Sequence, residues 1–281
     1  MRSGPVILTA LAMIAPGAGH AAEWYTGAPG SQPAPTAYIS AFPPQTDPVY
    51  TPLAPVSKSN GYVGAPTPKE TFGAAIDFAV TADSKGSRFA TAIATIAPFS
   101  GMDESGLRVR LGGVIGQYSY NKTLLGSVKG TQTDLSLMVG YEWVMPRLTF
   151  GVYGGGNYDH NSIDRYDPDN ASIGKGVGMK VALDFNYRPT DLTMFSGVAS
   201  YSTMHSAYYA RLKAGYAFAP QLYVGPEAIF MGDDFFSQWR LGLHMTGAKF
   251  GMLQVGASAG VMVDRVRGSG LYGILDARVG F

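Results

Sequence analysis

The feature that most constrains the fold is a strict two-residue alternation of side chains, clearest between residues 131 and 143. Odd-numbered positions there carry Thr, Leu, Val, Tyr and Trp, whereas even-numbered positions carry Gln, Asp, Ser, Met, Gly and Glu. Successive side chains of a β-strand point to opposite faces, so this segment has one apolar and one polar face. Soluble strands average about five or six residues, whereas a tilted strand that crosses a membrane needs about ten.

The same alternation recurs along the chain and predicts about twelve strands. Their ranges are 71–82, 87–97, 106–120, 131–144, 147–158, 175–188, 192–203, 207–218, 221–231, 235–246, 250–263 and 270–281. Charged residues share one parity and large apolar residues share the other, as in a barrel with lipid outside and polar groups inside. Segment 192–203 alternates least, because Ser, Thr and Gly dilute its pattern. We therefore predict an all-β fold, a transmembrane antiparallel up-and-down β-barrel spanning residues 70–281.

The connections between predicted strands alternate in length. The short ones are 145–146, 189–191, 219–220 and 247–249, and the long ones are 121–130, 159–174 and 264–269. Short periplasmic turns that alternate with longer outer loops are typical of outer-membrane barrels. Segment 98–105 is too long for a tight turn, and this pattern does not explain it.

Aromatic residues of the apolar parity gather beside the short connections. They are Tyr141, Trp143, Phe150, Tyr187, Phe218 and Phe250. Aromatic rings prefer the membrane–water interface, which predicts a belt at the periplasmic side. The last predicted strand also alternates up to a terminal aromatic residue, Phe281. Such an ending resembles the signal that the outer-membrane assembly machinery reads, so we expect Phe281 to serve as an assembly signal.

The N-terminal 69 residues differ in composition from the rest of the chain. Arg2, an apolar stretch over 6–15, the Pro16-Gly17 break and small residues near 22 predict a signal peptide over residues 1–22. Segment 23–69 contains ten of the 18 prolines and favours extended conformations that cannot fold alone. It is either a spacer or a periplasmic arm that recognises a partner. We expect export to the outer membrane of a Gram-negative bacterium.

Composition excludes several classes of function. The chain has no cysteine, which excludes a lipidated N-terminal Cys, disulfides and Cys-ligated metals. A formal net charge of +1 without a basic stripe gives no reason to expect nucleic acid. The four histidines form no cluster that would predict zinc. We expect no metal and no cofactor.

The polar parity supplies the candidate functional residues, because it should face the lumen. They are Arg108, Arg110, Tyr118, Asp134, Glu142, Lys180, Asp184, Arg211, Lys213, Glu227 and Arg240. In one interpretation these residues pair across a plugged lumen, as buried charges must. In the other they line a passage for neutral polyols, where Tyr and Arg bind sugar rings. A barrel of about twelve strands lies between filled and channel-forming sizes, so both interpretations stay open.

Catalytic chemistry has weaker support. His160 and Ser162 stand beside Asp159 and Asp164 and could form a hydrolase pair, but the solubility of the long predicted loop explains these residues without catalysis. The acidic run from Asp164 to Asn170 lacks the Gly and the terminal Glu of an EF-hand calcium loop. We predict no enzymatic activity and no catalytic residues.

Several segments together resemble one protein family, the cellulose biosynthesis protein BcsS family. They are the runs SGLRVRLGG at 105–113, YSY at 118–120, GYEW at 140–143, YARLKAGY at 209–216 and LYVGPE at 222–227. The resemblance covers roughly residues 70–281, and the Pro-rich segment departs from it as an insertion. It implies an outer-membrane barrel linked to cellulose production, and it implies no catalytic residue.

We therefore expect a non-enzymatic accessory of bacterial cellulose or exopolysaccharide biosynthesis or export. The alternatives are a narrow diffusion channel for small solutes or oligosaccharides and, with less support, a lipid-modifying outer-membrane enzyme. The expected partners are outer-membrane lipid, the outer-membrane assembly machinery and cellulose, other glucans or cellulose-synthesis components.

Overall fold

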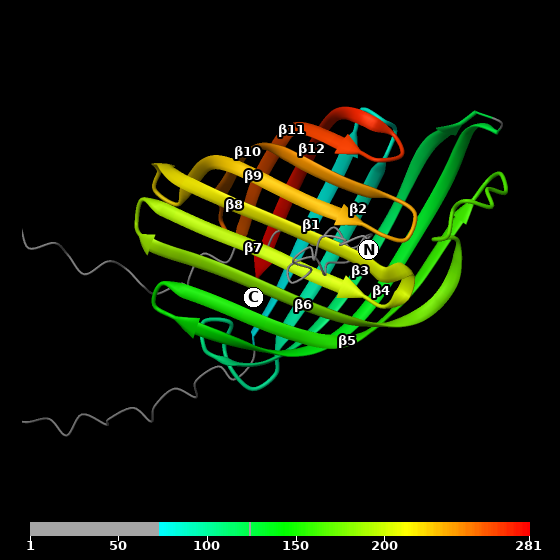
Figure 1. The fold of residues 1–281 in the computed structure, drawn as a ribbon. Coiled ribbons are helices and arrows are strands. Elements are labelled where there is room, and N and C mark those ends of the chain that lie inside the picture. Colours follow the sequence, from blue (N-terminus) through cyan, green and yellow to red (C-terminus); the bar gives the residue numbers. More distant parts are fainter. Residues whose placement is uncertain (1–72, 124) are drawn as a thin grey trace, which may run out of the picture.

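The computed structural model describes residues 73–123 and 125–281, which form a closed antiparallel barrel in which strands follow one another in chain order and β1 pairs with β12 (Figure 1). The strands are β1 (Gly73–Asp83), β2 (Arg88–Ala97), β3 (Gly106–Lys122), β4 (Gly126–Met145), β5 (Leu148–Ile163), β6 (Gly174–Thr190), β7 (Thr193–Ser202), β8 (Ala207–Ala219), β9 (Leu222–Gly232), β10 (Ser237–Phe250), β11 (Leu253–Asp264) and β12 (Gly268–Gly280). The predicted all-β, twelve-stranded barrel is confirmed. The predicted signal peptide and Pro-rich segment lie outside the described residues.

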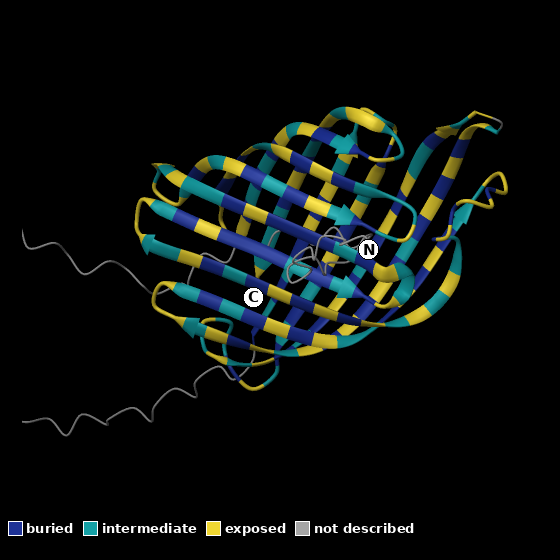
Figure 2. Ribbon diagram, in the orientation of Figure 1, coloured by how far each residue is buried: buried dark blue, intermediate teal, exposed yellow. Residues whose placement is uncertain are grey.

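The alternation in the sequence becomes an alternation of burial, visible as bands along every wall in Figure 2. On β4, Asp134 and Ser136 are buried inside the barrel, whereas Leu135 and Leu137 are 54% and 58% exposed on the outer surface. Exposed leucines in such a row are stable only against lipid, since water would penalise their apolar area. Within the described residues no helix is long and apolar enough to cross a membrane.

Two parts of the barrel wall differ in height. Strands β3 to β6 contain 16 to 20 residues, whereas the other strands contain 10 to 14. The ends of β3 and β4 extend beyond their neighbours at the upper right of Figure 1. We call β3–β6 the tall wall, and the end of the barrel where it projects the outer end. Outward positions near its tip are polar, as at Lys129, Thr131 and Thr133, so this part rises above the lipid band.

The prediction of a loop over 121–130 is wrong. Strands β3 and β4 stay paired to Lys122 and Gly126, which leaves a short connection at 123–125. Above the lipid band both faces of a strand can be polar, so hydropathy no longer alternates and the strand resembles a loop in the sequence. For the same reason β5 extends to Ile163, and His160 and Ser162 belong to a strand and not to the predicted loop.

The predicted turn over 247–249 is also wrong. Strand β10 continues to Phe250, and the turn falls at Gly251 and Met252. Gly247 has a φ of +104° and lies where the β10–β11 register shifts between Thr246 and Ala248. A glycine with positive φ suits a β-bulge as well as a turn, and the sequence alone does not separate the two.

Segment 98–105, unexplained by the sequence, is anchored to the barrel by an inward arginine. Arg108 Nη1 donates to Ser100 Oγ at 2.9 Å, and its Nη2 donates to the backbone oxygen of Glu104. Ser100 is buried. The segment thus packs back against the barrel at the end where β1 starts and β12 ends, which we call the turn end.

Aromatic residues lie on the outer surface near the turn end, as the interface belt predicts. The Tyr141 and Trp143 ring centroids are 4.9 Å apart, and those of Trp143 and Phe150 are 5.7 Å apart. Tyr187, Phe218 and Phe250 are exposed on the same side of the barrel. In barrels of this kind the end with tight turns faces the periplasm, so these rings mark the inner leaflet boundary.

Candidate functional site: the lumen and an outer pocket

The structure places the candidate residues on the inner face of the barrel, and all but Tyr118 are buried. Their alternation within each strand explains the shared face, but it does not explain which charges meet. Some contacts join neighbouring strands, but three ion pairs join strands that are not neighbours and therefore run through the interior: Arg110–Asp184, Lys180–Asp134 and Arg211–Asp276.

One network joins the strands of the tall wall. Arg108 pairs with Glu142 at 3.2 Å between Nη2 and Oε1, and the hydroxyl of Tyr153 donates to the other Glu142 oxygen at 3.2 Å. Arg110 Nη2 lies 2.7 Å from Asp184 Oδ2, and its guanidinium carbon lies 3.5 Å from the centroid of the Tyr153 ring. Strands β4 and β5 separate Arg110 from Asp184, so this pair crosses the interior.

A second group of contacts lies on β4 to β7. Lys180 Nζ lies 2.7 Å from Asp134 Oδ1, and Asn157 Nδ2 donates to the other Asp134 oxygen at 2.6 Å. The hydroxyl of Ser202 donates to Asn157 Oδ1 at 2.8 Å. Asp134 therefore has a cation on one oxygen and an amide donor on the other, which is what a buried carboxylate requires.

The most extensive network centres on Arg211. Its Nε donates to Glu227 Oε2 at 2.6 Å, and its Nη1 and Nη2 donate to the two oxygens of Asp276, each at 2.9 Å. Lys213 Nζ lies 3.3 Å from Asp276, and the Tyr272 hydroxyl donates to Glu227 at 3.0 Å. A bidentate arginine–carboxylate pair is the strongest geometry for such a contact. Arg211 lies on β8 and Asp276 on β12, with three strands between them.

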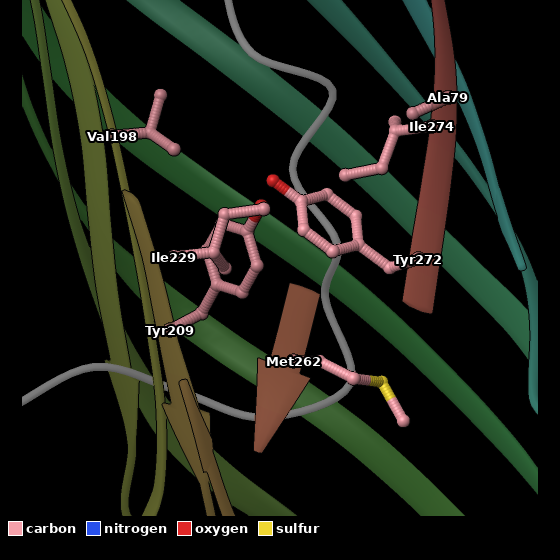
Figure 3. Close-up of a cluster of buried hydrophobic side chains, with 7 residues drawn as sticks. All are labelled: Ala79, Val198, Tyr209, Ile229, Met262, Tyr272 and Ile274. Carbon is pink, nitrogen blue, oxygen red and sulfur yellow. The ribbon is translucent and has the colours of Figure 1, made fainter. Parts of the chain in front are cut away.

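An apolar cluster lies inside the barrel (Figure 3) and shares Tyr272 with this network. It comprises Ala79, Val198, Tyr209, Ile229, Met262, Tyr272 and Ile274. Ile229 and Met262 are both 0% exposed. The alternation predicts a polar lumen, and it does not predict this cluster. The signal was present in the apolar residues at lumen parity, and it indicates an interior packed like a protein core.

An open pocket lies above the cluster at the outer end of the barrel. The empty space at this site is about 990 Å³, a figure that includes open solvent at the mouth. Its lining includes the side chains of Phe89, Tyr118, Tyr120, Gln132, Asn161, Tyr209, Arg211, Phe235, Phe236, Gln238, Arg240 and Arg267. Strand parity predicts Tyr118, Arg211 and Arg240 as lumen residues. It does not predict a pocket, because the lining residues come from strands and turns far apart in the chain.

The 233–236 turn borders this pocket and is shaped by Asp233. Its Oδ1 accepts hydrogen bonds from the backbone N–H groups of Phe235 and Phe236, at 2.7 and 2.9 Å. Burial raises the pKa of the Asp233 carboxyl above its usual value, although these hydrogen bonds oppose the rise. The turn thereby holds two phenylalanines at the rim of the pocket.

Comparison with known families shows to which family this barrel belongs. The family model for the cellulose biosynthesis protein BcsS matches residues 78–281, which is almost the whole described barrel. The chain belongs to this family. Its closed barrel with a lipid-compatible exterior places it in the outer membrane of a Gram-negative bacterium.

Solved structures with a similar outline include an outer-membrane channel from Pseudomonas putida F1, with 11% identity, 76% of this chain and 97% of that chain covered, and a TM-score of 0.48. The KdgM porin in complex with disordered oligogalacturonate has 9% identity, coverages of 74% and 99%, and a TM-score of 0.39. The translocator domain of the autotransporter NalP from Neisseria meningitidis has 13% identity, coverages of 74% and 87%, and a TM-score of 0.41. No curated protein matches the chain.

The hydrolase pair that the sequence offered does not assemble in this BcsS-family barrel. His160 and Ser162 occupy outward positions on β5, and the Ser162 hydroxyl contacts the Thr131 hydroxyl at 2.8 Å. Asp159 lies on the opposite, inner face and accepts a hydrogen bond from Gln132 at 3.1 Å. Because successive side chains of a strand point to opposite faces, Asp159 cannot reach His160 and Ser162 on the outer face.

The acidic residues of the run from Asp164 to Asn170 have protein partners. Asp167 accepts a hydrogen bond from the Tyr120 hydroxyl at 2.8 Å, and Asp169 lies 2.8 Å from Lys122 Nζ. Asp164 accepts a hydrogen bond from the backbone N–H of Lys129 at 2.8 Å. In the part of the chain that the structure describes, no three acidic or histidine side chains are grouped to hold a metal ion.

Proposed function

We propose that this barrel is a non-enzymatic outer-membrane accessory of cellulose or related exopolysaccharide biosynthesis, and that its own side chains close the lumen. Membership of the BcsS family supports the link to cellulose. The observation that carries the closed lumen is the pairing across the interior, above all between Arg211 on β8 and Asp276 on β12.

The pairing argues against a diffusion channel. Basic side chains that set the selectivity of a pore face water and the passing solute. Arg110, Lys180 and Arg211 instead lie within 3 Å of carboxylates and are at most 2% exposed. Opening a passage would therefore require these ion pairs to separate.

The geometry also argues against a lipid-modifying enzyme. Acyl transfer requires a nucleophile within hydrogen-bond reach of a base. His160 and Ser162 lie on the outer surface, and Ser162 bonds to Thr131 instead. A BcsS-family barrel with this arrangement is therefore better suited to hold or guide a partner than to react with one.

Assembly into the membrane belongs to the same proposal. Phe281 is exposed, and its backbone N–H donates to the Ala74 oxygen at 2.8 Å, next to the seam between β12 and β1. An exposed aromatic at the end of the closing strand is accessible to the assembly machinery before the seam forms. We propose that Phe281 is recognised there, and that outer-membrane lipid and cellulose-synthesis components are the other partners.

The proposal is tested by deleting this gene in a cellulose-producing strain that carries it and measuring secreted cellulose. We expect the deletion to change the amount of secreted cellulose or its retention at the cell surface. The wild-type gene and a variant carrying both His160→Ala and Ser162→Ala should restore it equally. Unchanged cellulose after deletion would reject the accessory role, and failure of the double variant alone would reject the non-enzymatic role.

A further inference from the structure

The outer pocket has the chemistry of a carbohydrate site. We propose that it binds a neutral, flat-faced glucan chain of the β-1,4 type, and this inference rests on the proposed role in cellulose biosynthesis. A pyranose with equatorial substituents presents two apolar C–H faces and a rim of hydroxyls. Its binding site therefore needs flat aromatic surfaces together with planar hydrogen-bonding groups at their edges.

Two aromatic rings lie flat against the wall of the pocket. Tyr118 on β3 stands opposite Gly130 on β4, and Phe89 on β2 stands opposite Gly116 on β3. A Cβ atom at either glycine would clash with the facing ring, so each ring covers the backbone of its neighbour. A ring that lies along the wall turns its other face toward the pocket that both residues line.

The tyrosine platform is held in place before any ligand arrives. The Tyr118 and Tyr120 rings lie 6.3 Å apart with an interplanar angle of 13°. The Tyr118 hydroxyl donates to Asn161 Oδ1 at 2.7 Å, and the Tyr120 ring packs against Phe235 at 5.1 Å. Side chains fixed in advance lose little conformational entropy on binding, which favours affinity.

Planar polar groups border these rings. Gln132, Asn161 and Gln238 line the pocket, and Gln238 is oriented by hydrogen bonds with Asp264 at 3.0 Å and with Arg240 at 2.6 Å. An amide offers two donors and two lone pairs, so these contacts leave capacity for sugar hydroxyls. The floor is apolar and includes Tyr209 and Ile274. A mostly apolar pocket with a few placed polar groups is the usual form of a small-molecule site.

The charges favour a neutral ligand. Two lining arginines have close carboxylate partners, Arg211 with Asp276 and Arg267 with Asp264 and Asp83, at 2.9 to 3.2 Å. The third, Arg240, donates to Gln238 and Thr81, and Asp233 accepts two backbone hydrogen bonds. An anionic sugar would compete with existing carboxylates for these cations, whereas a neutral glucan needs only hydrogen bonds. The tall wall continues this surface outward, since Tyr118 and Tyr120 lie on its inner side above the deeper ion pairs.

The test measures binding of cellohexaose to the full-length protein in detergent micelles by isothermal titration calorimetry. Maltohexaose, whose α-linkages curve the chain, and trigalacturonate, which is anionic, are the ligand controls. We expect binding of cellohexaose and at least about tenfold weaker binding of both controls. Equal binding of maltohexaose or trigalacturonate would overturn the specificity that we propose.

Matched variants locate the site. Tyr118→Leu and Phe89→Leu keep apolar volume but remove a flat face, and each should weaken cellohexaose binding about tenfold, a typical loss for one aromatic contact. Tyr118→Phe should retain binding to within about threefold, because the face remains and one hydrogen bond is lost. Tyr166→Ala, which changes an exposed tyrosine outside the pocket, should bind like the wild type.

The outcomes separate this inference from the proposed function. If folded protein, shown by heat-modifiable migration, fails to bind cellohexaose, or if both leucine variants bind normally, the pocket assignment is wrong. Loss of cellulose in the deletion strain would still support the accessory role in that case. If binding is confirmed but deletion leaves cellulose unchanged, the accessory role fails and the glucan site stands.

Discussion

The ion-paired interior and the outer pocket contain the same kinds of residue and differ in what those residues face. Inside, Arg211 meets Asp276 and Glu227, and its hydrogen-bonding capacity is used within the protein. At the outer end, Tyr118 uses its hydroxyl on Asn161 while its ring lines an open space. The difference shows that residue type and inward parity do not define a binding site. A binding site also requires side-chain surface that faces open space and is not already used in contacts within the protein.

The difference follows from the height of each residue relative to the lipid band. At the level of the membrane the wall closes the interior on all sides, so charges there must find partners across it. At the outer end the tall wall stands opposite shorter strands, and side chains meet solvent there. Stability should therefore depend on the interior, and ligand binding on the pocket.

The largest expected effect is the loss of stability when an ion pair of the interior is broken. Arg211→Met leaves Glu227 and Asp276 without their main cation, and we expect the free energy of unfolding to fall by about 3–5 kcal/mol. Urea unfolding in micelles, followed by heat-modifiable migration, measures this change. If Arg211→Met is as stable as the wild type, the interior pairs are not structural and the comparison fails.

A double substitution at Lys180 and Asp134 also tests whether the interior ion pairs stabilise the barrel. Lys180→Met alone should destabilise the barrel by about 3 kcal/mol, because it strands a buried carboxylate. Adding Asp134→Leu should recover much of that loss, since no unpaired charge then remains. The coupling free energy from the double-mutant cycle measures the pair, and simple additivity would contradict it.

In the outer pocket we expect a small loss of stability and a large loss of ligand affinity. Tyr118→Leu should lower the free energy of unfolding by no more than about 1–1.5 kcal/mol, the range for one hydrogen bond, while cellohexaose affinity falls about tenfold. The two quantities are measured on the same preparation by urea unfolding and calorimetry. A large loss of stability would show that Tyr118 belongs to the structural interior.

The smallest effect is expected at an exposed ion pair on the tall wall. Lys122 lies 2.8 Å from Asp169, whose side chain is 78% exposed. Asp169→Asn removes this exposed partner and leaves the contact of Lys122 with the buried Asp167. It should change the free energy of unfolding by about 0–1 kcal/mol, because water and salt screen such exposed pairs. This variant is the matched control for Arg211→Met, and equal losses from the two would remove the distinction between interior and surface.

The sequence predicted the barrel because lipid imposes a rule on every strand that crosses the membrane. Leu135 and Leu137 must face lipid, so Ser136 must face inward, and strand number and direction follow. Above the lipid band a strand no longer needs to alternate apolar and polar side chains. The outer part of β4 from Gly126 to Gly130 is therefore predicted as part of a loop, and Gly247 is predicted as part of a turn where the structure has a bulge.

The pairing inside the barrel was less accessible to sequence reasoning. Parity assigns Arg110 and Asp184 to the same face, but not to the same height. The two residues stand 74 positions apart, and their meeting depends on the register of the strands between them. The pocket was missed for a related reason, since Phe89, Tyr118 and Phe236 converge only when the barrel closes.

Single-channel recording in a planar lipid bilayer tests the closed lumen most directly. The full-length protein is inserted, and current is recorded across a range of voltages with and without cellohexaose. The account predicts no steady unit conductance, because the pairs centred on Arg110, Lys180 and Arg211 cross the interior. Stable unit currents that cellohexaose blocks would contradict it and establish a diffusion channel instead.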